Sequence, residues 1–183
     1  MEKIDVSGNL FEIIQINSHL KLAALPDMAV KIDKGAGDNF LRVMDGYIGE
    51  ICTLPLAFRT PPVFSFIILP CGEMFRTVTG CPFEQGMAGS HISLDENFPL
   101  TLGVDESWFE YGFDGDDNVQ RKTGLCHELA HTVHSHWFFQ MANEGFAELL
   151  PHYLMGLEAQ NTIHRQAVLS LSEKEMRTVG DIE

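Results

Sequence analysis

The stretch Cys126-His127-Glu128-Leu129-Ala130-His131 predicts both the centre of the fold and the chemistry of this chain. If the segment is helical, His127 and His131 lie one turn apart on one face, so two imidazole nitrogens can converge on a single tetrahedral metal ion. Glu128 then lies beside that face, where its carboxylate can accept a proton from a metal-activated water. The H-E-x-x-H spacing therefore indicates a catalytic zinc site with Glu128 as the general base.

A second acidic stretch, Asn143-Glu144-Gly145-Phe146-Ala147-Glu148, follows the first along the chain. Two histidines alone hold a catalytic zinc poorly, so a third protein ligand is expected, and Glu144 is the candidate. Glu148 lies one helical turn later, where its carboxylate can accept the free ring N–H of a ligand histidine and orient the ring. The alternative is a chance match of the H-E-x-x-H spacing, with two surface helices that expose their acids.

These two stretches, His-Glu-Leu-Ala-His and Asn-Glu-Gly-Phe-Ala-Glu, resemble the gluzincin metallopeptidases. The similarity is to the aminopeptidase-N-like branch and to the compact peptidase MA-like domains related to it. In that group the Glu of Asn-Glu-Gly-Phe-Ala is the third zinc ligand and the acid one turn later supports a ligand histidine, which implies these roles for Glu144 and Glu148. The spacer at 132–143 is shorter than in classical aminopeptidases, so the resemblance favours the compact relatives.

Apolar periodicity predicts the elements around the active-site helix. Alternation over 10–17 and a proline-bounded apolar run at 63–69 predict strands, and helical spacing from Asp38 predicts a helix that ends before Pro55. The stretch 100–111 is expected to form another strand or a wall segment of the site. The active-site helix is predicted over 119–135, with the acids and Asn118 just before it as caps.

Within the active-site helix, Leu125, Leu129 and Val133 are expected to supply apolar contacts. Cys126 is expected to pack, because its side chain points about 100° away from that of its neighbour His127. His134 shares the face of the histidine pair, but it is interpreted as a solvated or core histidine rather than a ligand, since residues seven apart on a helix are separated by about 10 Å of rise.

The glycine-led stretch 86–94 is expected to form an edge strand, whose free backbone groups can pair with an extended peptide. The residues expected to hold the substrate in this way are Gly86, Met87, Ala88, Gly89 and Ser90. Aminopeptidase-N-like enzymes carry Gly-Ala-Met-Glu-Asn on the corresponding strand, and Ala88 and Gly89 stand where its last two polar residues would be. The resemblance thus implies that the anchor for a free amino terminus is missing. The alternative is an ordinary glycine-rich hairpin, with His91 as a surface residue.

Composition narrows the classes of partner. The chain of 183 residues is 45% hydrophobic and has a net charge of -14, which argues against nucleic acid or an anionic membrane as a partner. It has no apolar run of about eighteen residues and no signal-peptide pattern at its start. The four cysteines lack C-x-x-C spacing, which favours reduced thiols in a cytoplasmic protein over a disulfide framework.

The sequence thus predicts an α+β fold over residues 1–183: one gluzincin-like domain, in which a small mixed sheet with an exposed edge strand packs on zincin active-site helices, as in a thermolysin-like catalytic domain. The expected function is a zinc-dependent metallopeptidase with one zinc ion and a peptide or protein substrate. Relatives usually continue with helices that bring a tyrosine or histidine to the oxyanion. No residue here matches that role, so the chain is expected to continue past Glu183. Two alternatives stay open: a catalytically impaired zinc-containing binding or scaffold domain, and a zinc hydrolase of a non-peptide substrate.

Overall fold

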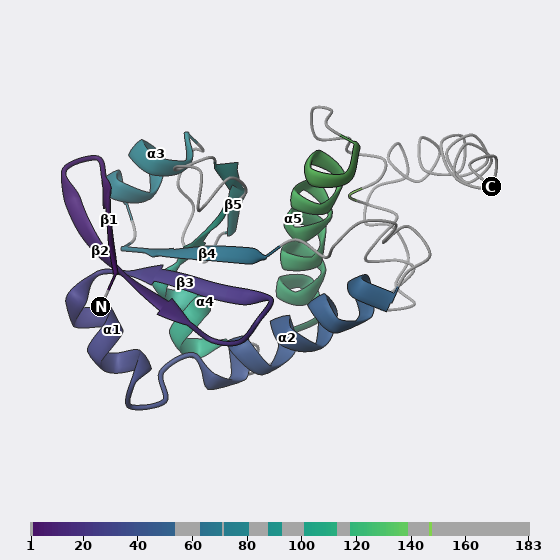
Figure 1. Ribbon diagram of the computed structural model, residues 1–183, viewed down its shortest axis with the longest axis horizontal. Helices are drawn as coiled ribbons and strands as arrows, with labels where there is room; N and C mark the ends of the chain where they lie inside the picture. The colour runs from purple at the N-terminus through teal and green to yellow at the C-terminus, as the bar shows by residue number, and fades with distance from the viewer. Residues whose placement is uncertain are drawn as a thin grey trace.

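The computed structural model describes residues 2–53, 63–70, 72–80, 88–92, 101–112, 118–138 and 147, with backbone alone at 51–53, 88–92, 118–120 and 132–138. These residues form a six-stranded mixed sheet with helices on both faces (Figure 1). The strands are β1 (Lys3–Val6), β2 (Asn9–Gln15), β3 (Leu20–Ala24), β4 (Phe64–Leu69), β5 (Ala88–Ile92) and β6 (Thr101–Asp105). The helices are α1 (Pro26–Ile32), α2 (Asp38–Thr53), α3 (Glu73–Thr79), α4 (Glu106–Tyr111) and α5 (Asn118–Phe138).

The strands lie in the order β1-β2-β3-β4-β6-β5. β2 is antiparallel to both of its neighbours, β1 and β3, whereas β3, β4 and β6 run parallel. β5 pairs antiparallel with β6 and is the last of the described strands on that side. The predicted mixed sheet is therefore confirmed, as are the strands expected within 10–17 and 63–69 and the edge strand expected within 86–94.

β4 lies at the centre of the sheet, and each of its six residues is buried. A strand with parallel neighbours is covered on both faces, which explains why Phe64–Leu69 reads as a continuous apolar run rather than an alternation. Its residues alternate between two cores. Phe64, Phe66 and Ile68 face the larger one, whereas Ile67 and Leu69 face the smaller one.

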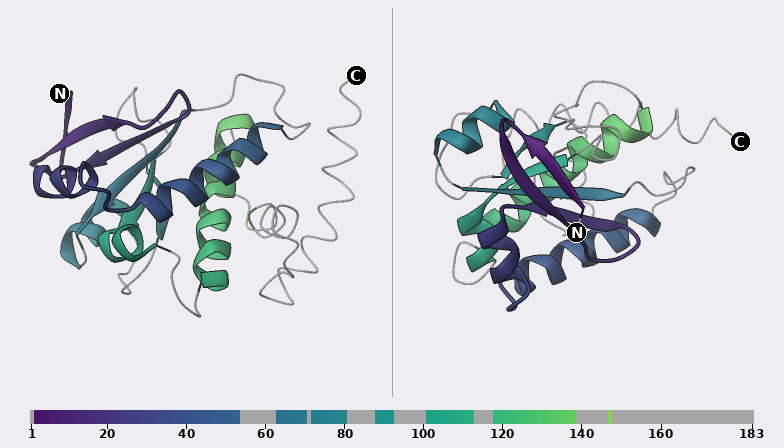
Figure 2. Two further views of the ribbon diagram at one scale, coloured as in Figure 1. Left: turned by 90° about the horizontal axis from the view of Figure 1, so that it is seen from below. Right: turned by 60° about the vertical axis from the view of Figure 1, so that its left-hand side comes forward.

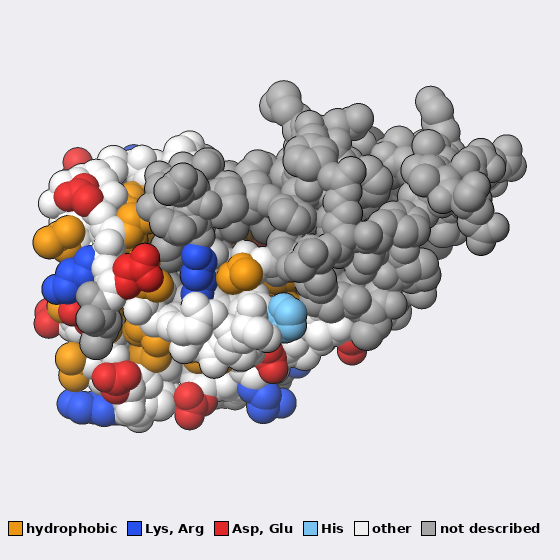
Figure 3. Space-filling view, in the orientation of Figure 1, with side chains coloured by type: hydrophobic (Ala, Val, Ile, Leu, Met, Phe, Trp, Pro, Cys, Tyr) orange, Lys and Arg blue, Asp and Glu red, His pale blue; other side chains and the backbone are white. Residues whose placement is uncertain are grey.

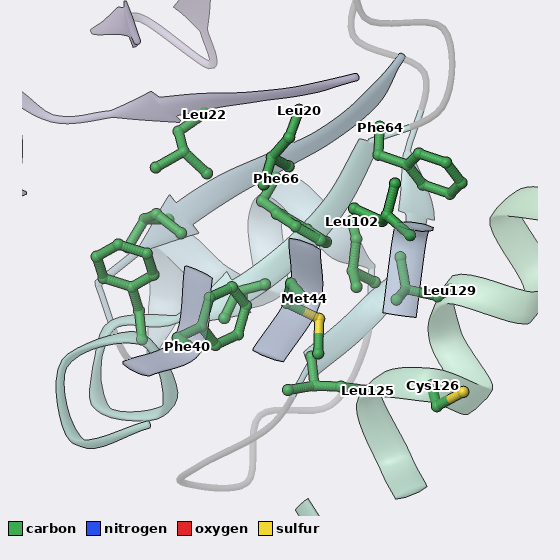
Figure 4. Close-up of a cluster of buried hydrophobic side chains, with 14 of the residues drawn as sticks. Leu20, Leu22, Phe40, Met44, Phe64, Phe66, Leu102, Leu125, Cys126 and Leu129 are labelled. Carbon is green, nitrogen blue, oxygen red and sulfur yellow. The ribbon is translucent and has the colours of Figure 1, made fainter. Parts of the chain in front are cut away.

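The larger core lies between the sheet and the helices α2, α4 and α5 (Figure 4). Helix α2 contributes Phe40, Met44 and Ile48, which recur every four residues and so form one stripe. Figure 2 shows α2 and α5 on the same side of the sheet. The smaller core covers the opposite face, where α3 and the hairpin of β1 and β2 contribute residues that include Phe75, Phe11 and Ile4.

The expectation of a single strand or wall segment over 100–111 is wrong in its second half. β6 ends at Asp105, and α4 begins at the next residue. The Asp105 side chain caps α4, because its Oδ1 accepts a hydrogen bond from the backbone N–H of Ser107 at 2.7 Å. The aromatic residues of this stretch therefore belong to a short helix, in which Phe109 is buried and packs against Phe40.

Both charge signs are interspersed on the described part of the surface shown in Figure 3. One ion pair there joins α1 to α4, between Lys31 and Glu110. Exposed large apolar side chains, such as Leu10 and Tyr111, are scattered over different elements. Within the described ranges, no helix is both long enough and apolar enough to cross a membrane.

Candidate metal centre

Helix α5 is fixed on the sheet by one of its sides. Leu125, Cys126, Leu129 and Ala130 are all buried in the larger core, facing Met44 and Leu102 among others (Figure 4). These contacts set the rotation of the helix about its axis. At 100° per residue, His127 and His131 then lie on a different side of α5, about 160° around from the two leucines. The helix predicted over 119–135 is confirmed, and so is the burial of Leu125 and Leu129 in its apolar stripe.

The two histidine rings approach each other through their Nε2 atoms. Nε2 of His131 lies 3.1 Å from Nε2 of His127, and the rings are nearly perpendicular, with centroids 4.7 Å apart and planes at 89°. Two nitrogens that each lie about 2.05 Å from one tetrahedral zinc ion are separated by about 3.3 Å. The observed spacing therefore fits a shared metal ion. It also fits a hydrogen bond between the rings when one Nε2 carries a proton.

The pair is partly enclosed. The side chain of His131 is 4% exposed, whereas His127 and Glu128 are half-buried. Nδ1 of His131 is itself buried. If Nε2 of this ring binds a metal, Nδ1 carries the proton, and its acceptor has to be a protein group or an enclosed water. His131 is therefore the more enclosed of the two rings.

Cys126 is a packing residue, as expected. It is fully buried in the larger core, and burial, together with the negative charge of Glu50, raises the pKa of its thiol to about 12. The thiol is therefore protonated at neutral pH, and a protonated thiol is neither a nucleophile nor a metal ligand. Tyr47 on α2 is also partly buried, and this burial raises the pKa of its hydroxyl to about 12. The negative charge of Glu50, and that of Cys126 when its thiol is ionised, act in the same direction.

The strand β5 lies beside α5, and the two elements contact each other. Its pairing with β6 is interrupted by an irregularity. Ala88 pairs with Val104 and His91 with Leu102, so two residues of β5 stand opposite the single residue Gly103 of β6. This count defines a β-bulge at residues 89–90. The substrate-binding role expected for residues 86–90 stays a prediction, and Gly86 and Met87 lie outside the described residues.

This bulge is not among the features predicted from the sequence, although one residue of the strand indicates it. Gly89 stands inside the strand, and a glycine within a strand often marks a bulge or a close backbone approach. The register shift itself depends on how β5 meets β6, which the sequence of β5 alone does not specify.

Glu144 and Glu148 lie outside the described residues, so their roles as third ligand and as ring-orienting carboxylate stay predictions. One residue of their stretch is described: Ala147 is helical and belongs to the same buried cluster as Leu125 and Leu129. Among the described residues alone, no group of three His, Cys, Asp or Glu side chains could hold a metal ion. The described part of the site therefore consists of His127, Glu128 and His131.

No protein-family model matches this chain, and no curated protein matches it either.

Proposed function

We propose that this chain is a zinc-dependent metallopeptidase domain of the gluzincin type. The observation that carries the proposal is the 3.1 Å separation of the two Nε2 atoms on one side of α5, with Glu128 next to them in sequence. In the proposal, His127, His131 and Glu144 hold one zinc ion. Bound there, the ion would polarise a peptide carbonyl and acidify a water.

The donor set fits zinc better than it fits magnesium or calcium. Two imidazole nitrogens and a carboxylate are the ligands of many catalytic zinc sites, whereas magnesium and calcium prefer oxygen ligands alone. The buried Nδ1 of His131 is the group that a ligand histidine presents to an orienting carboxylate. Glu148 is proposed for that role. Its neighbour in sequence, Ala147, is buried in the same core as Leu125, which supports this role.

Glu128 is proposed as the group that moves the proton. Its carboxylate accepts a proton as water attacks the carbonyl carbon, and then delivers that proton to the nitrogen of the leaving amine. The residue is half-buried and its Oε2 atom is buried, so the carboxylate is shielded from bulk solvent. Each cleavage returns the carboxylate to its starting state.

The edge strand β5 is proposed to hold the peptide. It is the last of the described strands on its side of the sheet, contacts α5 and leaves one row of backbone groups outside the β6 ladder. An extended peptide that pairs with those groups would be bound through its main chain, with little dependence on its side chains. A mixed sheet whose antiparallel edge strand borders the H-E-x-x-H helix supports the thermolysin-like arrangement proposed here. The buried, reduced Cys126 supports a cytoplasmic location.

The test combines metal analysis with hydrolysis of a fluorogenic peptide, with and without a chelator. Wild-type chain should contain zinc and lose activity in the chelator. Glu128→Gln should keep the zinc, because the residue is not a ligand, and should lose activity by at least about a thousandfold, because the proton acceptor is gone.

The matched control is Glu73→Gln, the same chemical change at an exposed position on α3, which should leave both readouts unchanged. A wild-type chain that binds no zinc would contradict the proposal. Zinc binding with no hydrolysis of peptides would instead favour the alternative of a zinc-containing binding domain or of a hydrolase with a non-peptide substrate.

A further inference from the structure

The strand β1 lies at the other edge of the described sheet, at the opposite end of the strand order from β5 (Figure 1). Among the described strands it pairs with β2 alone, to which the two-residue turn of Ser7 and Gly8 joins it. Both turn residues have positive φ, as the tight turns of β-hairpins require, and such a turn fixes the register of its strands. β1 is therefore held by β2, and its outer side is directed away from the sheet.

Hydrogen bonds to β2 engage every second residue of β1. The backbone N–H of Ile13 donates to the carbonyl of Glu2 at 2.9 Å, one position beyond the opposed pair of Lys3 and Glu12. Hydrogen-bonded and non-hydrogen-bonded pairs alternate along an antiparallel ladder. The backbone N–H and C=O groups of Lys3 and Asp5 therefore point away from β2, toward the open side of the strand.

The side chains of these two residues have opposite charges. Lys3 and Asp5 are exposed on one face of the hairpin, whereas Ile4 between them is buried in the smaller core. A lysine on an edge strand ordinarily opposes pairing with another copy of the same strand. In β1 the acid two residues later removes this obstacle. An antiparallel pairing that sets Lys3 opposite Asp5 of a second copy also sets Asp5 opposite Lys3 of that copy.

The charges also select one register among those that the backbone allows. The outward groups of the two copies must face each other, so the register can change only in steps that keep Lys3 and Asp5 in hydrogen-bonded pairs. One step in either direction would place two lysines or two aspartates opposite each other, and like charges at that position are destabilising. The pairing of Lys3 with Asp5 is therefore the favoured one.

We propose that β1 pairs antiparallel with β1 of a second copy of this chain, in the register that sets Lys3 opposite Asp5. The outward N–H and C=O groups of both residues then form hydrogen bonds between the copies. Ile4 lies on the two-fold axis, opposite Ile4 of the second copy, in a non-hydrogen-bonded pair, where side chains approach each other more closely. The smaller cores of the two copies thus become continuous.

This pairing goes beyond the proposed function and does not depend on it. The strands β2, β3, β4 and β6 separate β1 from β5, so two sheets joined through β1 leave β5 at both ends of the combined sheet. β1 has only four residues, so the interface is expected to fall below about 1,200 Å², in the range of weak complexes. The dissociation constant is expected to be on the order of 100 µM.

The experiment is sedimentation velocity of the full chain, over concentrations that extend about tenfold to either side of that dissociation constant. Wild-type chain should show a monomer–dimer equilibrium. Lys3→Asp and Asp5→Lys should each weaken dimerisation by at least about tenfold, because like charges then meet at both symmetry-related positions. The two changes shift the net charge of -14 in opposite directions, so general repulsion between copies would weaken one dimer and strengthen the other.

An equimolar mixture of the two variants separates pairing from misfolding. Each aspartate of one variant then meets a lysine of the other, so a mixed dimer should form with about the dissociation constant of the wild type. Chains that had lost their fold would not regain association on mixing. The matched control is Lys34→Asp, the same chemical change at an exposed position between α1 and α2, which should dimerise like the wild type.

Three results would overturn the inference. They are a wild type that stays monomeric over the whole range, single variants that dimerise like the wild type, and a mixture of variants that stays monomeric. None of these readouts involves zinc or peptide hydrolysis, so failure of the pairing and failure of the proposed function are observed separately.

Discussion

The two sides of helix α5 differ in what holds their residues in place. The side with Leu125 and Leu129 is packed into the larger core, where each side chain is fully buried and contributes to stability. The side with His127 and His131 places two ring nitrogens 3.1 Å apart, close to the spacing that a shared metal requires. The comparison shows that the packed leucines hold α5 in place. The histidine pair on the other side can therefore keep its spacing although it contributes little to stability itself. Substitutions on the two sides should therefore affect different measurements.

The largest effect on stability should come from Leu129→Ala. This change leaves a cavity between α5 and the sheet, and it should lower the free energy of unfolding by about 3 kcal/mol, measured by urea denaturation. The loss should be the same in zinc and in chelator, because Leu129 is not one of the proposed zinc ligands. A loss that appeared only in zinc would break the proposed division between the two sides.

A smaller effect should come from His127→Ala, and it should depend on the metal. At a free zinc concentration about 100 times the dissociation constant, binding stabilises the folded wild type by about 2.7 kcal/mol. The variant should lose most of that increment. Because His127 is only half-buried, the free energy of unfolding of the variant in chelator should stay close to that of the wild type. The measurement is a pair of urea curves, in zinc and in chelator. An undiminished zinc increment would exclude His127 as a ligand.

The smallest effect should come from Gly124→Ala, which should stabilise the chain by about 0.5–1 kcal/mol. Glycine within a helix costs about that much relative to alanine. A Cβ atom here would meet the ring of Trp108 at 3.5 Å, which is ordinary contact. Activity should not change. The matched control is Gly37→Ala, which should destabilise the chain, because φ is +80° there and the new Cβ would lie 2.2 Å from the Phe109 ring. Thermal unfolding of both variants would show whether Gly124→Ala raises the melting temperature and Gly37→Ala lowers it.

Long, strongly periodic elements could be predicted from the sequence. The four-residue recurrence in α2 and α5 and the apolar run of β4 reflect burial of one stripe or of two faces, and such burial is visible in residue type alone. The short elements β1, β3, α1 and α3 were not predicted. The helices among them have seven residues each, so they complete too few turns to show a period, and tertiary contacts decide their state.

The candidate site divides in the same way. The spacing of His127 and His131 specifies a shared face once a helix is assumed, so the convergence of their rings could be predicted. The bulge in β5 could not, because it depends on a register shift between two strands rather than on either strand alone. Glu144 and Glu148 were expected from the resemblance, and their placement lies outside the described residues.

The sheet order also constrains the sequence of events during folding. β1, β2 and β3 are joined by short turns, so this meander pairs residues that are close in the chain and can form early. The parallel pairs of β4 with β3 and β6 join segments far apart in sequence, and closing those long loops is slower. α5 docks on residues that only these late pairs bring together, such as Met44 and Leu102. The histidine pair of α5 should therefore be among the last parts of the described fold to reach its final position, and a chain arrested at the meander stage would lack the proposed metal site.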